Sequence, residues 1–197
     1  YKLPFNRQIQ PFRHHPWQPT SQDERDELKR LKSKLLQQGV VKPADCAGYV
    51  SKSRLEPKKD GGFRLVVDLR HLNNHLEPTT CKYESLGTLE NMLRPSDYMV
   101  SFDLKSGYYH IPIHPDLTKY FTTILDGTLV SFQALPFGLS TAPRVFTKVM
   151  RPFVAAMRAK RIRVLPYIDD FLIMAESKEL ALQQRATAED LLRRLGL

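Results

Sequence analysis

An apolar segment near the end of the chain, residues 165–174, is interrupted by two adjacent acids, Asp169 and Asp170. Burying this pair of charges inside a strand would destabilise the fold strongly unless a partner compensated them. A tight turn that carries the acids to a surface, together with a cation that neutralises them, removes most of that cost. The segment therefore predicts a hairpin of strands 164–167 and 171–175 around the aspartates.

A third acid, Asp103, ends another apolar segment, residues 98–104. Carboxylates at the ends of two strands can share hard divalent cations such as Mg²⁺. The three acids therefore indicate metal-assisted phosphoryl transfer. The alternatives are an ordinary polar turn at Asp169 and Asp170, because so short a motif also arises by chance, and a strand-end cap at Asp103.

The composition indicates a folded chain with an anionic partner. Of 197 residues, 42% are apolar, and 30 Lys and Arg exceed 21 Asp and Glu to give a net charge of +9. This excess fits nucleic acid, although a soluble basic protein is the alternative. Cys46 and Cys81 lack a metal-binding spacing, which predicts a reduced, intracellular chain. No membrane span and no signal peptide are expected.

Local patterns predict an α+β chain that begins with an irregular, basic, proline-rich arm over 1–20. A capping box at Ser21 opens a helix that Gly39 ends. Further helices are expected over 83–93, over 142–160 with a kink or break at Pro152, and from Ser177 to about 195. Hairpins are expected from strands 49–55 with 63–69 and 121–125 with 129–133, a strand over 98–102, and a turn or short helix over 105–110.

Four motifs in order resemble the reverse transcriptases. They are Gly-Gly-Phe-Arg-Leu-Val-Val-Asp-Leu-Arg-His-Leu-Asn-Asn (61–74), Phe-Asp-Leu-Lys-Ser-Gly-Tyr-Tyr-His-Ile-Pro-Ile (102–113), Leu-Pro-Phe-Gly-Leu-Ser-Thr-Ala-Pro-Arg-Val-Phe (135–146) and Tyr-Ile-Asp-Asp (167–170). One motif alone is weak, whereas four at this spacing are specific. The third most resembles retrotransposon enzymes, with DIRS-like elements as the first assignment and gypsy-like elements as the second.

The resemblance implies the palm of a right-hand polymerase, with an antiparallel sheet and helices, preceded by fingers. It divides the chain into the arm 1–20, a fingers-like region with early palm 21–97, and a palm 98–197 that carries the catalytic acids. The chain starts without Met and stops directly after a helical segment, so it is expected to be a piece of a longer protein. The thumb and the RNase H segment of the parent polyprotein are expected to lie outside it.

The resemblance also implies the roles of the acids. Asp103 and Asp169 match the two metal-binding acids, with Asp170 in support and the Leu104 carbonyl as a further ligand. Two Mg²⁺ ions, or Mn²⁺, would activate the primer 3′-hydroxyl and hold the triphosphate. Side chains of adjacent strand residues point to opposite faces, so Asp169 and Asp170 reach the same metals only if the turn rotates one of them inward.

Nucleotide-binding roles follow by the same resemblance. Arg64 and a hairpin-tip lysine such as Lys58 would grip the triphosphate, Tyr108 would exclude the ribose 2′-hydroxyl, and Phe137 and Gly138 would contact nucleotide and template. Many retroviral enzymes have Gln where this chain has Phe137. The alternatives are a solvated hairpin for the cations and an ordinary core tyrosine for Tyr108. An acid-free basic series would track phosphates or face solvent: Arg151, Arg158, Lys160, Arg161 and Arg163.

The function that follows is RNA-directed DNA polymerisation by a retroelement, with an RNA or DNA template, a primer and dNTPs as partners. A polymerase that makes RNA is a second hypothesis, and Tyr108 argues against it. A nucleic-acid-binding module without catalysis, from a domesticated or truncated element, is a third. The retained Asp103, Asp169 and Asp170 argue against it, whereas the expected truncation argues for inactivity of the isolated piece.

Overall fold

The computed structural model describes residues 1–45, 48–57, 62–81, 83–84 and 86–197, and they form two compact units. The first unit contains residues 1–78 and 111–142, and the second contains 79–110 and 143–197. Each unit therefore takes two separate stretches of the chain. The division at residues 20 and 97, which follows chain order, stays a prediction.

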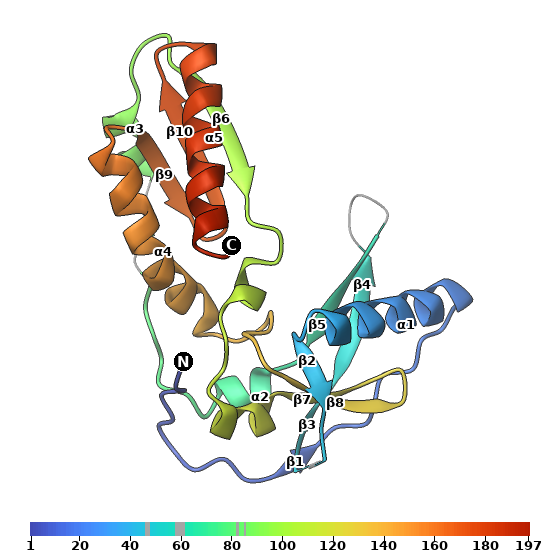
Figure 1. The fold of residues 1–197 in the computed structure, drawn as a ribbon. Coiled ribbons are helices and arrows are strands. Elements are labelled where there is room, and N and C mark those ends of the chain that lie inside the picture. The colour runs from blue at the N-terminus through green and yellow to red at the C-terminus, as the bar shows by residue number, and fades with distance from the viewer. Residues whose placement is uncertain (46–47, 58–61, 82, 85) are drawn as a thin grey trace. The chain divides into compact units, whose positions relative to one another are not determined.

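The first unit is built on a five-stranded sheet with the strand order β1-β3-β7-β8-β2. The strands are β1 (Phe12–Arg13), β3 (Tyr49–Ser51), β7 (Thr122–Leu125), β8 (Thr128–Phe132) and β2 (Val41–Pro43). The antiparallel pair β7 and β8 confirms the predicted hairpin (Figure 1). Its turn residues Asp126 and Gly127 have φ of 47° and 71°, as the tight turns that suit twisted strands require.

The predicted pairing of 49–55 with 63–69 is partly wrong, because the first segment is divided between two sheets. Strand β3 ends at Ser51, and only β4 (Ser53–Pro57) pairs with β5 (Phe63–Val67) in a separate two-stranded sheet. The Ser51 carbonyl accepts from Thr123 Oγ1 at 2.8 Å, and Ser53 Oγ donates to the Ile124 carbonyl at 3.2 Å. These bonds to β7 are long-range, so no local pattern reveals the break.

Helix α1 (Gln22–Gln37) begins as predicted, because Ser21 and Glu24 form the complete capping box. Its Leu28 and Leu35 are buried, and Lys32 Nζ lies 2.6 Å from the Asp126 carboxylate in the β7–β8 turn. The first unit also contains two short helices that the sequence did not predict, α2 (Arg70–Asn73) and the 3₁₀ helix η2 (Pro115–Phe121).

The arm is largely irregular, as expected, but it packs closely on the first unit. Phe12 pairs with Tyr49 in the parallel β1–β3 ladder, and Phe5 forms an isolated bridge with Leu76. Leu3 and Ile9 are buried. The high proline content correctly predicts an irregular backbone. The apolar side chains spaced along the arm nevertheless pack against the rest of the first unit.

The second unit contains the antiparallel sheet β6-β10-β9, which confirms the palm-like expectation (Figure 1). Its strands are β6 (Tyr98–Asp103), β10 (Asp170–Ala175) and β9 (Arg163–Tyr167). Phe102 and Phe171 are cross-strand partners and their rings stack at 5.2 Å. Phe153 meets the Phe171 ring edge-on at 5.3 Å, so this sheet and a helix share one aromatic core.

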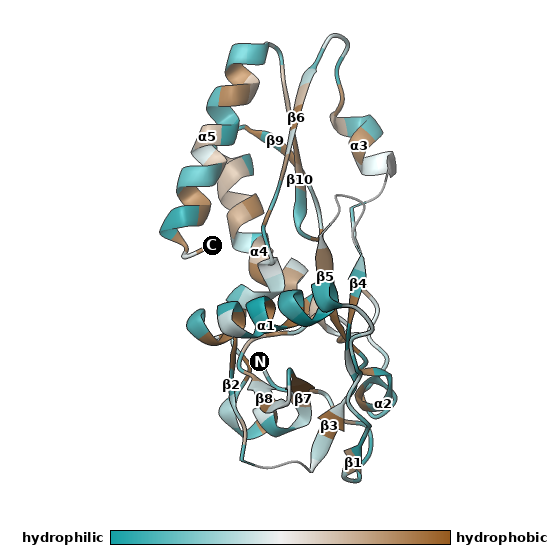
Figure 2. Ribbon diagram, turned by 90° about the vertical axis from the view of Figure 1, so that its right-hand side faces the viewer, coloured by the Kyte–Doolittle hydropathy of each residue, from teal (hydrophilic) through white to brown (hydrophobic). Residues whose placement is uncertain are grey.

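The helices of the second unit are α3 (Leu86–Met92), α4 (Ala142–Ala159) and α5 (Lys178–Arg194), with a short 3₁₀ helix η1 (Gly107–His110) after β6. Hydrophilic and hydrophobic residues alternate along α5 (Figure 2), which contacts β6 and β10. Helix α4 continues through Pro152, so the predicted break is wrong, while the alternative of a kink stays a prediction. Pro152 is exposed, whereas Phe153 and Met157 anchor the following turns in the core. None of the described helices is long and apolar enough to cross a membrane.

Candidate active site

Three carboxylate residues meet at one end of the β6-β10-β9 sheet. Asp103 is the last residue of β6 and Asp170 the first of β10, and the two are direct cross-strand partners. Asp169 lies in the turn between β9 and β10, and its backbone carbonyl accepts a hydrogen bond from Leu104 N at 3.0 Å. This bond ties the end of β6 to the aspartate turn. The Leu104 carbonyl, predicted as a ligand, accepts from Gly107 N at 3.3 Å.

The turn that carries Asp169 has an unusual backbone. Ile168 has φ of 58°, in the left-handed region that a β-branched residue rarely occupies. Such a residue costs about 1–3 kcal/mol and persists where the surroundings require it, often at functional sites. The left-handed backbone of Ile168 therefore makes this turn a candidate functional position.

The carboxylates influence one another electrostatically. Burial raises the pKa of Asp170 above its ordinary value, and the negative charges of Asp169 and Asp103 raise that pKa further. A cation placed among them would relieve this repulsion, and carboxylate oxygens are the ligands that Mg²⁺ prefers. In the described part of the chain, no group of three His, Cys, Asp or Glu side chains is arranged to hold a metal ion by itself. A Mg²⁺ ion bound here would have to take its remaining ligands from water and substrate phosphates.

Tyr108 lies on η1 in the same unit as the acids. Its half-buried ring packs edge-on against Phe146 at 5.5 Å. Burial, with the charge of Asp169 next, raises the pKa of Tyr108 to about 12. An added Cβ at the preceding Gly107 would lie 2.8 Å from the Phe146 ring, so only glycine allows η1 this close to α4. Burial alone raises the pKa of the adjacent Tyr109 to about 12.

The other predicted nucleotide-binding residues belong to the first unit. Arg64 is exposed on β5, where none of the described residues pairs with its guanidinium. Phe137 is half-buried and Gly138 is exposed. Lys58 lies outside the described residues. Thus the second unit brings together Asp103, Leu104, Tyr108, Asp169 and Asp170, while Arg64, Phe137 and Gly138 are on the first.

Asn73 is a residue of this region that sequence reasoning missed. Its side-chain amide donates to the Gly138 carbonyl at 2.9 Å and accepts from Ser140 N at 2.9 Å. The side chain thereby holds the backbone on both sides of Leu139. Its position within the motif 61–74 was the available signal, but the sequence does not reveal which asparagine of that motif contacts the loop.

Gly138 has a backbone that other residues cannot adopt without strain. Its φ is 99°, and an added Cβ would lie 2.7 Å from the Val67 carbonyl oxygen. We predict that Gly138→Ala lowers the free energy of unfolding by about 3 kcal/mol or more. Gly127→Ala is the matched control, because φ there is 71° with nothing within 4 Å, and about 1 kcal/mol is expected. Urea denaturation measures both, and equal losses would contradict the close approach to Val67.

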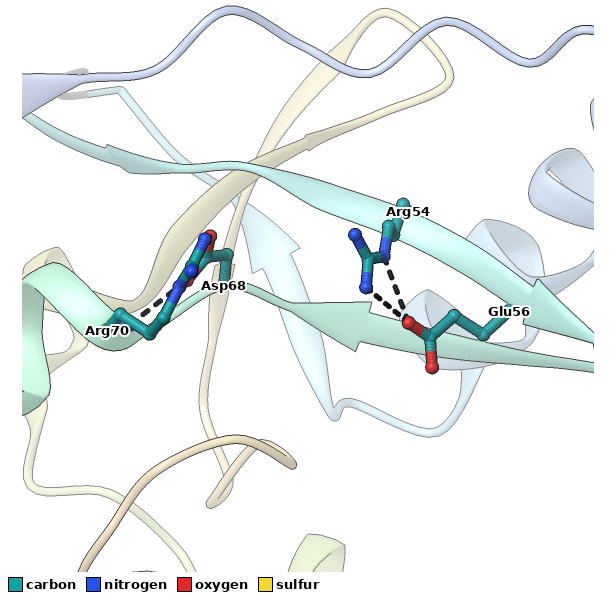
Figure 3. Close-up of polar contacts among 4 residues, drawn as sticks. All are labelled: Arg54, Glu56, Asp68 and Arg70. Atoms are coloured by element: carbon teal, nitrogen blue, oxygen red, sulfur yellow. Dashed lines mark hydrogen bonds and ion pairs between the residues drawn. The ribbon is translucent and has the colours of Figure 1, made fainter.

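Gly138 also borders a basic hollow of about 380 Å³, which is lined by Lys52, Arg54, Asp68 and Arg70 among others. Within it, Arg70 donates to both carboxylate oxygens of Asp68, at 2.9 and 2.6 Å (Figure 3). Arg54 donates to Glu56 from two nitrogens, at 3.0 and 2.5 Å. Asp68 and Arg70 therefore form an ion pair. The Arg54 guanidinium is oriented by Glu56 on the same strand, and the Arg70 guanidinium by Asp68, which lies between β5 and α2.

The Asp68–Arg70 pair predicts a dependence of stability on pH. The Arg70 hydrogen bond lowers the pKa of Asp68 from 3.8 to about 2, so the pair stabilises the folded state above about pH 4. That contribution is lost as the pH falls from about 4 to about 2. Because the Asp68 side chain is 35% exposed, we expect less than about 1 kcal/mol. Urea denaturation should show Asp68→Asn less stable than wild type at neutral pH and equal near pH 2, whereas a constant difference would contradict the pairing.

The basic residues on and between α4 and β9 differ in their partners: two are paired with acids and three are exposed. Arg158 donates to both Glu84 oxygens at 2.7 Å, and Arg163 donates to Asp97, whose side chain is only 2% exposed. Both arginines therefore act within the protein. Arg151, Lys160 and Arg161 are exposed, and they remain candidates for phosphate contacts.

Comparisons with known proteins show which family this chain is similar to. Residues 56–197 match the family described as reverse transcriptase (RNA-dependent DNA polymerase). The chain is 30% identical over 158 residues to the retrovirus-related Pol polyprotein from transposon opus of Drosophila melanogaster, covering 77% of this chain and 15% of that protein. It is 27% identical over 172 residues to the Gag-Pol polyprotein of Walleye dermal sarcoma virus, covering 85% of this chain and 10% of that protein. The chain thus spans only a small part of these relatives.

Solved structures share the fold. The crystal structure of native Prototype Foamy Virus protease-reverse transcriptase matches 95% of this chain and 25% of its own, with a TM-score of 0.77 and 22% identity. The foamy viral protease-reverse transcriptase in complex with dsDNA matches 98% of this chain and 40% of its own, with a TM-score of 0.78 and 21% identity. The likeness to these structures concerns the fold, whereas the family match over residues 56–197 makes the chain a member of the reverse transcriptase (RNA-dependent DNA polymerase) family.

Proposed function

We propose that this chain carries the nucleotide-adding centre of an RNA-directed DNA polymerase from a retroelement. The observation that supports this most is the meeting of Asp103, Asp169 and Asp170 at one end of an antiparallel sheet, on a turn with a strained Ile168. The family match and the retroelement polyproteins among its relatives support the same reaction. The substrates are a template, a primer and dNTPs.

In this proposal Asp103 and Asp169 bind two Mg²⁺, or Mn²⁺, and Asp170 supports them through the shared turn. Bound there, the ions would lower the pKa of the primer 3′-hydroxyl and stabilise the pyrophosphate that leaves. The protein's own contribution is to fix the acids before substrate arrives. The Leu104–Asp169 backbone bond and the β6–β10 register do this without using the carboxylate oxygens.

The first unit supplies groups that suit nucleotide and template. Arg64 and Lys58 would bind the triphosphate, because guanidinium and ammonium groups stabilise the charge that spreads over phosphate oxygens. Phe137 and the exposed Gly138 backbone would contact nucleotide and template beside the basic hollow of Lys52, Arg54 and Arg70. In that hollow Arg54 and Arg70 are each paired with a carboxylate, so among the described residues Lys52 is the lining cation without an ion pair there.

Primer extension tests the proposal. We expect the chain to extend a DNA primer on an RNA template with dNTPs and Mg²⁺, and to stop when the metal is chelated. The same mixture with Ca²⁺ in place of Mg²⁺ controls for non-specific loss of binding. Template binding that persists with no extension under any divalent metal would overturn catalysis and favour the binding-module alternative.

Tyr108 supplies a second, independent prediction. We expect Tyr108→Val to raise the ratio of rNTP to dNTP incorporation by at least about tenfold, because the ring no longer meets the 2′-hydroxyl. Single-nucleotide incorporation with paired dNTPs and rNTPs measures this ratio. If both rates fell equally, Tyr108 would have only a packing role against Phe146. An unchanged preference would also remove the argument against an RNA-making polymerase.

A further inference from the structure

A hollow of about 490 Å³ lies on the first unit between the arm and helix η2. No step of the proposed polymerase reaction uses it. It is lined by Phe5, Asn6, Arg7, Gln8, Ile9, Tyr49, Lys119 and Tyr120. Every lining residue is thus aromatic, aliphatic, amide or cationic, and the arm contributes more than half of them.

Three aromatic rings form one wall of this hollow. The Phe5 and Tyr120 centroids lie 5.0 Å apart, and those of Tyr49 and Tyr120 lie 4.6 Å apart. All three residues are only half-buried, so they keep accessible surface. Accessible aromatic faces of this kind can stack on nucleobases.

The cations of the hollow are held without neutralisation. Arg7 Nη2 donates to the Asn74 carbonyl at 2.9 Å, which orients the guanidinium and leaves its charge unpaired. Lys119 Nζ lies 5.2 Å from the centre of the Tyr120 ring. Among the described residues, no carboxylate forms an ion pair with either cation, and the nearby Asp116 lies 3.5 Å from His114 instead.

We propose that this hollow binds an unpaired nucleotide of single-stranded nucleic acid. The base stacks on the Tyr49 and Tyr120 rings, and Arg7 and Lys119 bind the flanking phosphates. The combination of a stacking wall, two unneutralised cations and amide side chains is what sequence-tolerant single-strand sites use. This proposal rests on the proposed function only because both require that the chain binds nucleic acid. Binding in the hollow needs neither a metal ion nor the three aspartates.

The test is fluorescence anisotropy of labelled oligodeoxythymidylate and oligouridylate with the full chain, in the presence of a metal chelator and without dNTPs. We expect Tyr120→Leu to weaken binding by roughly 5- to 150-fold, since it keeps apolar volume but removes the stacking face. We expect the double variant Arg7→Gln, Lys119→Gln to reduce the slope of log affinity against log salt by about 1.4, for two phosphates. Lys34→Gln, an exposed lysine on α1, is the matched control and should behave as wild type.

Crosslinking gives a readout that does not depend on affinity. Oligouridylate carrying 4-thiouridine should crosslink to peptides containing Tyr49 or Tyr120, and circular dichroism verifies that each variant is folded. Equal binding by wild type, Tyr120→Leu and the double cation variant would overturn the site, as would crosslinks confined to other peptides. Failure of primer extension with this single-strand binding intact would instead contradict the polymerase proposal, so the two failures are distinguishable. Stronger binding of one oligonucleotide decides between RNA and DNA as the strand bound.

Discussion

Replacing Asp103 with asparagine should reduce primer extension by about 10²–10⁴-fold, the largest effect expected in this chain. The substitution keeps the size of the side chain but removes one negative charge from the group of three carboxylates. Divalent cations contribute several kcal/mol to a phosphoryl-transfer transition state, and each 1.36 kcal/mol is a factor of ten in rate. Single-turnover extension on an RNA template measures the loss.

The same experiment needs a control in the same unit. Asp190 lies on α5, is exposed, and pairs with Arg194 at 2.9 Å and with Arg193 at 3.9 Å, so Asp190→Asn removes an acid that is not one of the three at the sheet end. We expect its extension rate to equal that of wild type. A rate for Asp103→Asn within about twofold of the control would contradict a role for Asp103 in metal binding.

The second large effect concerns stability. Phe146 on α4 is completely buried, where it contacts the ring of Tyr108 and fills the space that Gly107 leaves open. Phe146→Ala should therefore lower the free energy of unfolding by about 3–5 kcal/mol, through lost burial and the cavity that remains. Since folded domains are stable by only about 5–15 kcal/mol, this variant is expected to be partly unfolded under mild conditions.

Val149 on the same helix is the matched control, because its side chain is 47% exposed. Urea denaturation of Val149→Ala should differ from wild type by less than about 0.5 kcal/mol. If the two alanine variants were equally stable, the contact between η1 and α4 would not be part of the core. That result would also remove the packing that positions Tyr108 beside Asp169.

The sequence predicts three elements of this chain well, because each of them is specified by a local pattern. The Asp169–Asp170 hairpin, the strand ending at Asp103 and the capped helix at Ser21 each depend on residues close in the chain. Because a buried charge is costly, acids that follow apolar strands are expected at the strand ends, where water or a cation can reach them. The hairpin, strand and cap found in the structure confirm these predictions.

Long-range contacts explain what the sequence did not predict. The break between β3 and β4 depends on Ser51 and Ser53 bonding to β7, some seventy residues away. The docking of the arm depends on Phe12 pairing with Tyr49, and the role of Asn73 depends on a loop at Gly138. Helix α4 continues through Pro152 because tertiary packing overrides the local penalty.

The most direct test of the central claim is to titrate Mn²⁺ into the protein and follow the free ion by electron paramagnetic resonance. The account predicts a Mn²⁺ site in wild type whose affinity Asp103→Asn lowers by at least about tenfold. Replacing residues that merely hydrogen-bond to a metal ligand already lowers metal affinity by about that factor. Asp190→Asn should retain the wild-type affinity. Equal Mn²⁺ affinity in wild type and Asp103→Asn would contradict the claim that the end of the β6-β10-β9 sheet is a metal-dependent catalytic centre.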